Sequence, residues 1–481
     1  MRITNKMMTN NMLYNINTNK NNMTALENKY ASGLEIQKPS DDPIVAVRAL
    51  KLRTNLSELT QYYKKNIPDA KSWMDTTESA LKNTSEIITK IHTYCVQGAN
   101  DTLTESERSS IADNLRELKN QAYAEGNSNY AGRYLFTGYK TDTPLLFEAQ
   151  ETNLEYTITE KFEVSDIEIS SRIVDSLDVD NFDPANYEIP SSNKIYRIRL
   201  AYDKLKEGGD FELSPAAAVN TVQSDDPKAY KPGDLEINFI EDTGELILGP
   251  EVFKNWRTSD VKIEVKYQKD SFNKDELRPE HYFDCTCVNK DDLSAEPIIY
   301  KIADQRIEYE INFNQRLAIN VQGRDAFRHS LGRTVDDVIK AISDVDNVKE
   351  KLARVEKNLK DTTLTQDEID NNKLMQRLLN TELDLKDSLM REAYGRALTY
   401  MTAEENQVSA ATSDIGTRYK RLELTEDRLS TQQVEFTDLL SQNEDADLVD
   451  TIVHYNSANT VYNASLQAAG KVVKNSLLDF L

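Results

Sequence analysis

Only a few residues of this chain have the type and spacing that catalysis or metal binding would need. The 481 residues include four histidines and three cysteines. No histidine stands in a His-Glu-x-x-His spacing or beside a plausible nucleophile, which argues against a hydrolase. The four are His92, His281, His329 and His454.

His281, Cys285 and Cys287 are the one group with metal-binding potential. A structural zinc site needs four ligands and a wider spacing between its paired cysteines, so we expect no metal here. Both cysteines are instead expected on one face of a strand. Cys95 lies on the apolar stripe of a helix pattern and is predicted to be a small core residue rather than a reactive thiol.

Acidic residues dominate the chain, whose formal net charge is -23. The cluster of Glu444, Asp445 and Asp447 lacks the glycine and the terminal glutamate of a calcium loop. It precedes Leu448, where negative charge favours a helix start. A chain without a basic surplus is not expected to bind nucleic acid. We predict no catalytic residue, no cofactor and no metal ion.

The sequence also lacks the usual signals for membranes and oxidative folding. No stretch approaches 18 uninterrupted apolar residues, and residues 1–20 are rich in asparagine with no apolar segment behind their positive charges. We expect no membrane insertion and no cleaved signal peptide. Three cysteines are too few for a disulfide framework, which suits a cytosolic protein or one exported without oxidative folding.

Both ends of the chain are predicted to be helices with one narrow apolar stripe, which we call the terminal seams. A single stripe has nothing to bury against in water, so each end needs a partner helix, either in this chain or in another. Asn19 and Asn459 stand on the seams and either fix register or face solvent. The predicted assembly interface consists of Met8, Met12, Ile16, Met23, Leu26, Tyr30, Leu448, Ile452, Tyr455, Asn459, Tyr462, Leu466, Ala469, Val473 and Phe480.

The first helix is predicted to stop at Gly33, and a new helix to start after a short connection. Pro39 cannot continue a helix, Asp42 can accept hydrogen bonds from free helical amides, and Pro43 suits the first helical turn. We therefore predict an inter-domain connection at Pro39, Asp42 and Pro43. Further along, Pro68 is expected to kink or break the helix that follows.

The middle of the chain, from about residue 145 to 330, has the short alternating apolar runs of β-strands. Strands are expected at 195–200, 235–240, 261–267 and 307–321. This region also holds about 38 acidic and about 22 basic side chains, which is most of the net charge. Helical patterns with capping boxes at Thr104 and Thr365 flank it. The predicted fold class is α+β, with helical arms around an inserted, mainly-β domain.

Five short motifs, in order along both arms, resemble the family of bacterial flagellar hook-associated protein 3, the hook–filament junction proteins related to flagellin. They are residues 1–4 (MRIT), 39–43 (PSDDP), 132–138 (GRYLFTG), 422–429 (LELTEDRL) and 476–481 (SLLDFL). The resemblance covers approximately 1–145 and 331–481. It implies a flagellin-like fold: a long helical coiled-coil rod formed by both arms, with the β domain outside.

The resemblance further implies a five-part domain organisation. Residues 1–40 and 441–481 form the two halves of an inner coiled-coil domain, 41–144 and 331–440 the two halves of a helical rod domain, and 145–330 the inserted outer β domain. It implies a structural protein that forms the extracellular junction ring between hook and filament. The partners it implies are identical subunits, the neighbouring hook-associated protein, flagellin, a dedicated export chaperone and the flagellar type III export apparatus.

Three alternatives remain. Flagellin, the filament subunit, shares the fold, the export route and the terminal helices. A cytoplasmic coiled-coil scaffold with a β recognition domain predicts stable homodimers through the tail. An enzyme has only the weak Cys285 and Cys287 pair in its favour.

Overall fold

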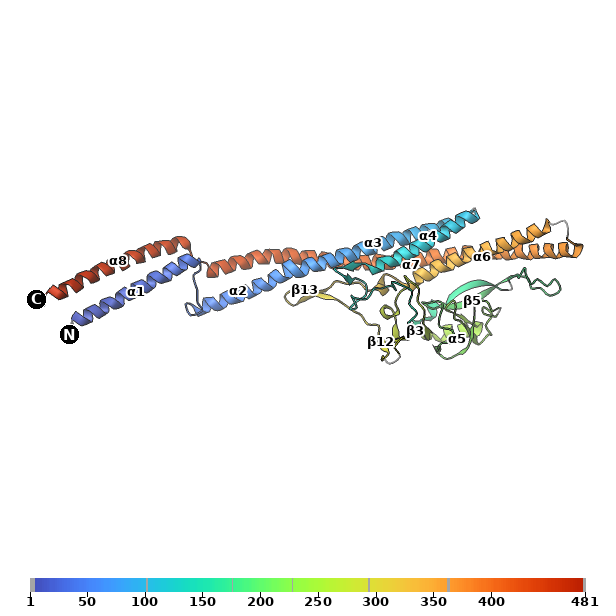
Figure 1. Ribbon diagram of the computed structural model, residues 1–481, viewed down its shortest axis with the longest axis horizontal. Coiled ribbons are helices and arrows are strands. Elements are labelled where there is room, and N and C mark those ends of the chain that lie inside the picture. Colours follow the sequence, from blue (N-terminus) through green and yellow to red (C-terminus); the bar gives the residue numbers. More distant parts are fainter. Residues whose placement is uncertain are drawn as a thin grey trace. The chain divides into compact units, whose positions relative to one another are not determined.

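The protein has helical ends and a strand-rich middle, so the expected α+β fold class is confirmed (Figure 1). A computed structural model describes residues 5–100, 103–174, 176–226, 228–292, 295–360 and 364–478. The helices are α1 (Asn5–Ser32), α2 (Pro43–Gln61), α3 (Ile67–Gly98), α4 (Glu105–Ala124), α5 (Pro250–Ser259), α6 (His329–Leu359), α7 (Gln366–Glu444) and α8 (Leu448–Leu478). None of these helices, within the ranges given, combines the length and apolar character that crossing a bilayer requires.

Two compact units divide the described residues. The first contains the chain up to Asp69, the short segment Glu310–Arg316, and the chain from Arg421 onward. The second contains Ala70–Tyr309 and Leu317–Lys420. The predicted boundaries at residues 40 and 441 both fall inside the first unit, and the five-part division stays a prediction.

In the first unit, α1 and α8 lie side by side and antiparallel (Figure 1). Backbone hydrogen bonds tie the end of α1 to the start of α8. The Glu35 amide donates to the Glu444 carbonyl over 2.7 Å, and the Ala446 amide donates to the Gly33 carbonyl over 2.9 Å. The two terminal helices are therefore paired with each other.

The connection between α1 and α2 has the predicted local chemistry. Gly33 ends α1 with a φ of 70°, a conformation that costs glycine little. The Asp42 carboxylate caps α2 by accepting from the amides of Ile44 and Val45, and Pro43 occupies the first turn. The stop and restart predicted from the sequence is confirmed.

Of the two outcomes predicted for Pro68, a kink or a break, the break is wrong. Helical structure continues from Pro43 to Gly98 through a π-helical turn, Tyr62–Asn66, in which the Ile67 amide donates to the Tyr62 carbonyl. The π turn changes the hydrogen-bond pattern just before the residue that lacks a donor, so Pro68 falls in the first turn of α3. A hairpin packs against this turn: the rings of Tyr62 and Phe313 meet edge-on at 5.6 Å.

The second unit holds two five-stranded sheets. One has the order β12-β11-β3-β10-β6 and the other β4-β5-β9-β8-β7. The short hairpin β1-β2 accompanies them. The hairpin β13-β14 is shared, because its segment Glu310–Arg316 belongs to the first unit. The strands are β1 (Asn129–Tyr130), β2 (Arg133–Tyr134), β3 (Leu154–Phe162), β4 (Glu168–Val174), β5 (Ser191–Arg199), β6 (Glu212–Ser214), β7 (Ala218–Val222), β8 (Glu236–Ile240), β9 (Glu245–Leu248), β10 (Ile263–Lys269), β11 (Asp284–Asn289), β12 (Ile298–Tyr300), β13 (Glu308–Asn312) and β14 (Gln315–Ala318).

One hydrophobic core serves both sheets and α5. Tyr156 and Val265 come from the first sheet, Ile198 and Leu246 from the second, and Trp256 from α5. Three of the four predicted strand segments match β5, β8 and β10, and the fourth is the hairpin β13-β14. Helix α5 was not predicted from the sequence.

Helix α6 buries the apolar stripe that its sequence predicts, including Val338, Ile342 and Val345. The capping boxes are also present. The Glu107 amide donates to Thr104 at the start of α4, and the Glu368 amide donates to Thr365 at the start of α7.

Candidate assembly interface

The α1–α8 pair is where the structure places the predicted terminal seams. Ile16 is the most buried residue of α1, at 9% exposed. Asn19 Nδ2 donates to Ser465 Oγ over 2.9 Å, which links the two helices across the seam. The Asn459 side chain instead accepts from Asn463 on its own helix. Asn19 can therefore fix register between α1 and α8, since a polar pair on an apolar seam favours one alignment.

The predicted interface residues divide into those facing the partner helix and those facing outward. The half-buried group, which joins Ile16 in the seam, is Met12, Met23, Leu26, Tyr455, Asn459, Tyr462 and Ala469. The exposed group is Met8, Tyr30, Leu448, Ile452 and Leu466. Phe480 and the side chain of Val473 lie outside the described residues, as do residues 1–4 of the first motif. The seams meet each other within one chain, and part of each predicted stripe remains uncovered.

A second set of apolar side chains on the same pair was missed by the sequence analysis. Its members are at least half exposed: Met7, Leu13, Tyr14, Val449, Val453 and Val461. Several of them are adjacent in sequence to a predicted seam residue. Pairs of adjacent apolar residues in the sequence could therefore have indicated this second set. A helix with apolar residues beyond one narrow stripe has surface for a second partner. The α1–α8 pair thus has apolar surface available for contacts with other molecules.

The thiols have the surroundings of core residues. Cys285 and Cys287 point to one face of β11 and belong to the shared core, as predicted. Burial raises the pKa of Cys95 to about 12 and also raises the pKa of Cys285. Burial lowers the pKa of His281 to about 4, and its Nε2 lies 3.2 Å from the Pro144 carbonyl. Among the described residues no three potential ligands converge on a metal site.

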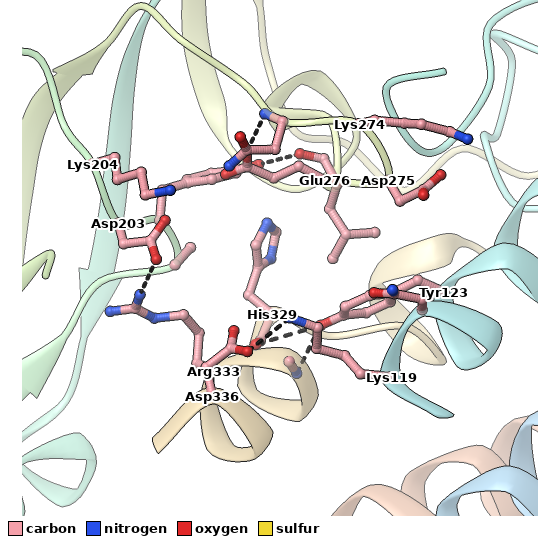
Figure 2. Close-up of a pocket in the computed structure, with 16 residues that line it drawn as sticks. Lys119, Tyr123, Asp203, Lys204, Lys274, Asp275, Glu276, His329, Arg333 and Asp336 are labelled. Atoms are coloured by element: carbon pink, nitrogen blue, oxygen red, sulfur yellow. Dashed lines mark hydrogen bonds and ion pairs between the residues drawn. The ribbon is translucent and has the colours of Figure 1, made fainter. Parts of the chain in front are cut away.

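A cavity of about 290 Å³ in the second unit is lined by several charged groups (Figure 2). Lys119 pairs with Asp336 at 2.7 Å, and Arg333 pairs with Asp203 at 3.4 Å. The His329 ring lies between these pairs, and burial, with repulsion from Arg333, lowers its pKa to about 3. Acid–base catalysis is most efficient when a group titrates near the working pH, so a histidine whose pKa is lowered to about 3 is poorly suited to it.

The low pKa of His329 predicts a pH-dependent loss of stability. The unfolded chain binds this proton near pH 6.5 and the folded chain only near pH 3, so stability falls as pH falls between these values. We expect His329→Phe, which fits among the rings of Tyr202, Tyr282 and Phe283, to be stabilised relative to wild type by about 1 kcal/mol for each pH unit below 6.5. Urea unfolding at pH 7, 6 and 5 measures it.

Tyr282→Phe is the matched control, because it changes the same aromatic cluster without removing a group that titrates in this range. Its free energy of unfolding should follow the wild-type pH dependence. Identical pH slopes for wild type and His329→Phe would show that the imidazole is not held neutral.

Comparisons with known proteins match both ends of the chain. Residues 3–141 match the bacterial flagellin N-terminal helical region, and residues 398–481 match the bacterial flagellin C-terminal helical region. The first match contains α1 to α4, and the second contains the end of α7 and α8. The flagellin-like fold class is confirmed by these matches together with the helical ends and the strand-rich middle.

Flagellins and hook-associated proteins are both among the relatives. A flagellin of Clostridium tyrobutyricum is 36% identical over 121 residues, which are 25% of this chain and 32% of that protein. Flagellar hook-associated protein 3 of Salmonella typhimurium is 30% identical over 144 residues, 30% of this chain and 45% of that protein. The matched segments thus span less than half the length of these relatives.

A crystal structure of flagellar hook-associated protein 3 from Legionella pneumophila is also similar. The two sequences are 10% identical, the structural alignment covers 82% of this chain and 98% of that chain, and the TM-score is 0.31. The sequence matches carry the assignment. Both ends of the chain therefore match terminal helical regions of bacterial flagellin, and its resemblance to flagellar hook-associated protein 3 is confirmed.

Proposed function

We propose that this protein is a structural subunit of the bacterial flagellum and forms the junction ring between hook and filament. The observation that carries the proposal is the apolar surface of the α1–α8 pair, formed by the two segments that match flagellin terminal regions. Exposed apolar side chains such as Tyr14 and Val449, which are 72% and 74% exposed, gain free energy when neighbouring subunits cover them.

The partners follow from the same proposal. Identical subunits surround one another in the ring through their terminal helices, the neighbouring hook-associated protein and flagellin lie on its two sides, and an export chaperone holds the chain before the type III apparatus exports it without a cleaved signal peptide. The protein acts outside the cell and is not an enzyme. In this proposal, residues 1–40 and 441–481 form the inner coiled-coil domain. Residues 41–144 and 331–440 form the helical rod domain, and residues 145–330 form the outer β domain.

The pairing of α1 with α8 refines how the ends assemble. The intramolecular seam is short of buried residues, with Ile16 the most buried position of α1. Such a pair is marginal alone, because helix formation needs packing that a narrow seam cannot supply. We propose that the pair gains its rigidity when neighbouring copies cover the exposed stripe, and that its amide hydrogens exchange rapidly in the isolated chain.

Flagellin is the second candidate, favoured by the 36% identity to the Clostridium tyrobutyricum protein. A filament subunit needs a large number of copies, whereas a junction ring needs few. Quantifying this chain in sheared filaments separates the two: a chain that makes up most of the filament mass is flagellin. A cytoplasmic scaffold is the third, and stable homodimers of the isolated protein, formed through the tail, would favour it.

The location of the protein on the cell tests the proposal. Gold-labelled antibody against the β region, residues 145–330, is expected to label one site at the base of each filament in electron micrographs. Label along the whole filament would favour flagellin, and label confined to the cytoplasm would exclude both flagellar roles. A strain that lacks the chain supplies the control for antibody specificity.

A further inference from the structure

A second cavity of about 210 Å³, distinct from the one in Figure 2, lies in the second unit and is lined by more basic than acidic side chains. Its basic residues are Arg172 from β4, Lys340 from α6, and Lys386 and Arg396 from α7. Its described acidic residues are Asp337 and Asp344 from α6. A basic cavity is unexpected in a chain whose net charge is -23.

Asp337 is already neutralised by arginines that lie behind the cavity wall. Its carboxylate is 2.5 Å from Arg197 Nη2 and 2.9 Å from Arg199 Nη1. Arg197 is 1% exposed and also contacts Glu168 at 2.8 Å and Glu245 at 2.6 Å. This carboxylate therefore has little capacity left to balance the cations that face the cavity.

Two of the cations that line the cavity lack a hydrogen-bond acceptor or an ion-pair partner among the described residues. Arg172 contacts Glu245 through Nη2 at 3.3 Å, but its buried Nε has no acceptor among the described residues. Lys340 is exposed and forms no ion pair with any residue that the structure describes. A buried donor without an acceptor is costly, and an anion that enters the cavity can supply one.

The other two cations contribute positive charge although each has a partner. Arg396 pairs with Glu392 at 2.7 Å, and Lys386 pairs with Glu382 at 3.3 Å. Burial, with repulsion from Arg197, lowers the pKa of Arg396. The carboxylates of Glu382 and Glu392 are not among the residues that line the cavity. The described lining therefore has four cationic and two anionic side chains, and a bound anion would reduce the repulsion among its cations.

We propose that this cavity binds a small oxyanion of the phosphate type. Guanidinium groups with planar N–H donors match the oxygen geometry of such an anion, and the Ser171 and Ser176 hydroxyls on the same wall can donate further hydrogen bonds. The cavity is smaller than most sites for drug-sized ligands, so a group of a few atoms suits it better than a nucleotide. The bound anion would join β4 to α6 and α7.

The test is titration calorimetry of inorganic phosphate into the full chain, with sodium chloride holding the ionic strength constant. We expect saturable binding of one phosphate per chain. Lys340→Gln should weaken the affinity at least five-fold, since it removes a cation that has no structural partner to lose. Lys274→Gln is the matched control, because Lys274 lines the separate cavity of Figure 2. The phosphate affinity of this variant should equal that of wild type.

A second measurement excludes a trivial loss of structure. Phosphate should raise the midpoint of thermal unfolding of wild type and Lys274→Gln, and should raise that of Lys340→Gln much less, while circular dichroism spectra of all three proteins coincide. Heats that do not saturate at constant ionic strength would overturn the proposal. Equal weakening in the Lys340 and Lys274 variants would also overturn it, because it would mean that net charge alone attracts phosphate. The proposal does not depend on the flagellar role.

Discussion

Deletion of residues 441–481 is expected to abolish attachment of filaments to the cell. The deletion removes α8, which is the partner of α1 in the antiparallel pair, together with the exposed stripe on α8 that includes Val449 and Val453. Helix α1 then loses the helix it packs against, and one side of the proposed contact with neighbouring copies is missing. Counting filaments on cells that carry only the truncated chain measures the effect.

The second unit should survive this deletion, because all of its residues lie between Ala70 and Lys420. Near-ultraviolet circular dichroism of the purified truncated chain, which reports the packing of the aromatic core, should match that of the full chain. A truncated chain that still attaches filaments at the normal number would contradict the role of the terminal helices. A chain whose aromatic core signal is lost would need the point variants described next.

Ile16→Asp and Asn15→Asp form a matched pair within α1. Both introduce a carboxylate, at adjacent positions, but Ile16 is buried in the seam and Asn15 is exposed. Placing a charge in the seam costs several kcal/mol unless it stays solvated, so Ile16→Asp should separate α1 from α8. We expect few or no filaments with Ile16→Asp and at least half the normal number with Asn15→Asp. Equal filament numbers would argue against the seam.

Local chemistry explains which parts of the fold were predictable from sequence. Asp42 and Thr104 cap helices through hydrogen bonds to amides two or three residues away, so the short motif alone predicts the helix start. Pro68 was harder, because a π turn five residues long precedes it and no single-residue preference predicts that turn. Here the hairpin residue Phe313, distant in sequence, packs against Tyr62 in the turn.

Tertiary packing explains why helix α5 was not predictable from the sequence. Helix α5 has only ten residues, between two strands, and its apolar residues would also suit a strand. Val252 and Trp256 are buried in the core that both sheets share, and this packing selects the helical conformation.

The apolar seams of the two terminal helices were predictable from the sequence, but the helix that each seam contacts was not. Spacing placed Met12, Ile16 and Tyr455 on the seams, and in the α1–α8 pair these side chains are buried or half-buried. Spacing alone could not say that α1 and α8 pair with each other, or that neighbours such as Leu13 and Tyr14 face outward. That choice depends on the backbone bonds between Gly33 and Ala446, which no single-helix pattern contains.

The ion cluster in the second unit depends on still more distant contacts, and it supports the other large prediction. Asp337→Asn is expected to lower the free energy of unfolding by about 3 kcal/mol, because it leaves Arg197 buried with one fewer carboxylate. Arg199 loses the same partner. Chemical denaturation at pH 7, followed by near-ultraviolet circular dichroism, measures the change.

Asp336→Asn is the matched control for Asp337→Asn. The two residues are adjacent on α6, but the side chain of Asp336 is 45% exposed and pairs with Lys119 near the surface, so its loss should cost less than about 1 kcal/mol. Similar losses in the two variants would mean that the buried cluster contributes no more than a surface pair.

Acid provides an independent measure of the same cluster. Although burial alone would favour the neutral acid, Arg197 and Arg199 hold the pKa of Asp337 well below its usual value, and Arg172 and Arg197 lower the pKa of Glu245 to about 2. As pH falls, the unfolded chain therefore takes up these protons first. The stabilisation is complete above about pH 5 and is lost progressively towards pH 2. The Asp337→Asn variant lacks the stabilisation that the Asp337 carboxylate provides. Its free energy of unfolding should therefore fall less steeply between pH 5 and pH 3 than that of wild type or Asp336→Asn.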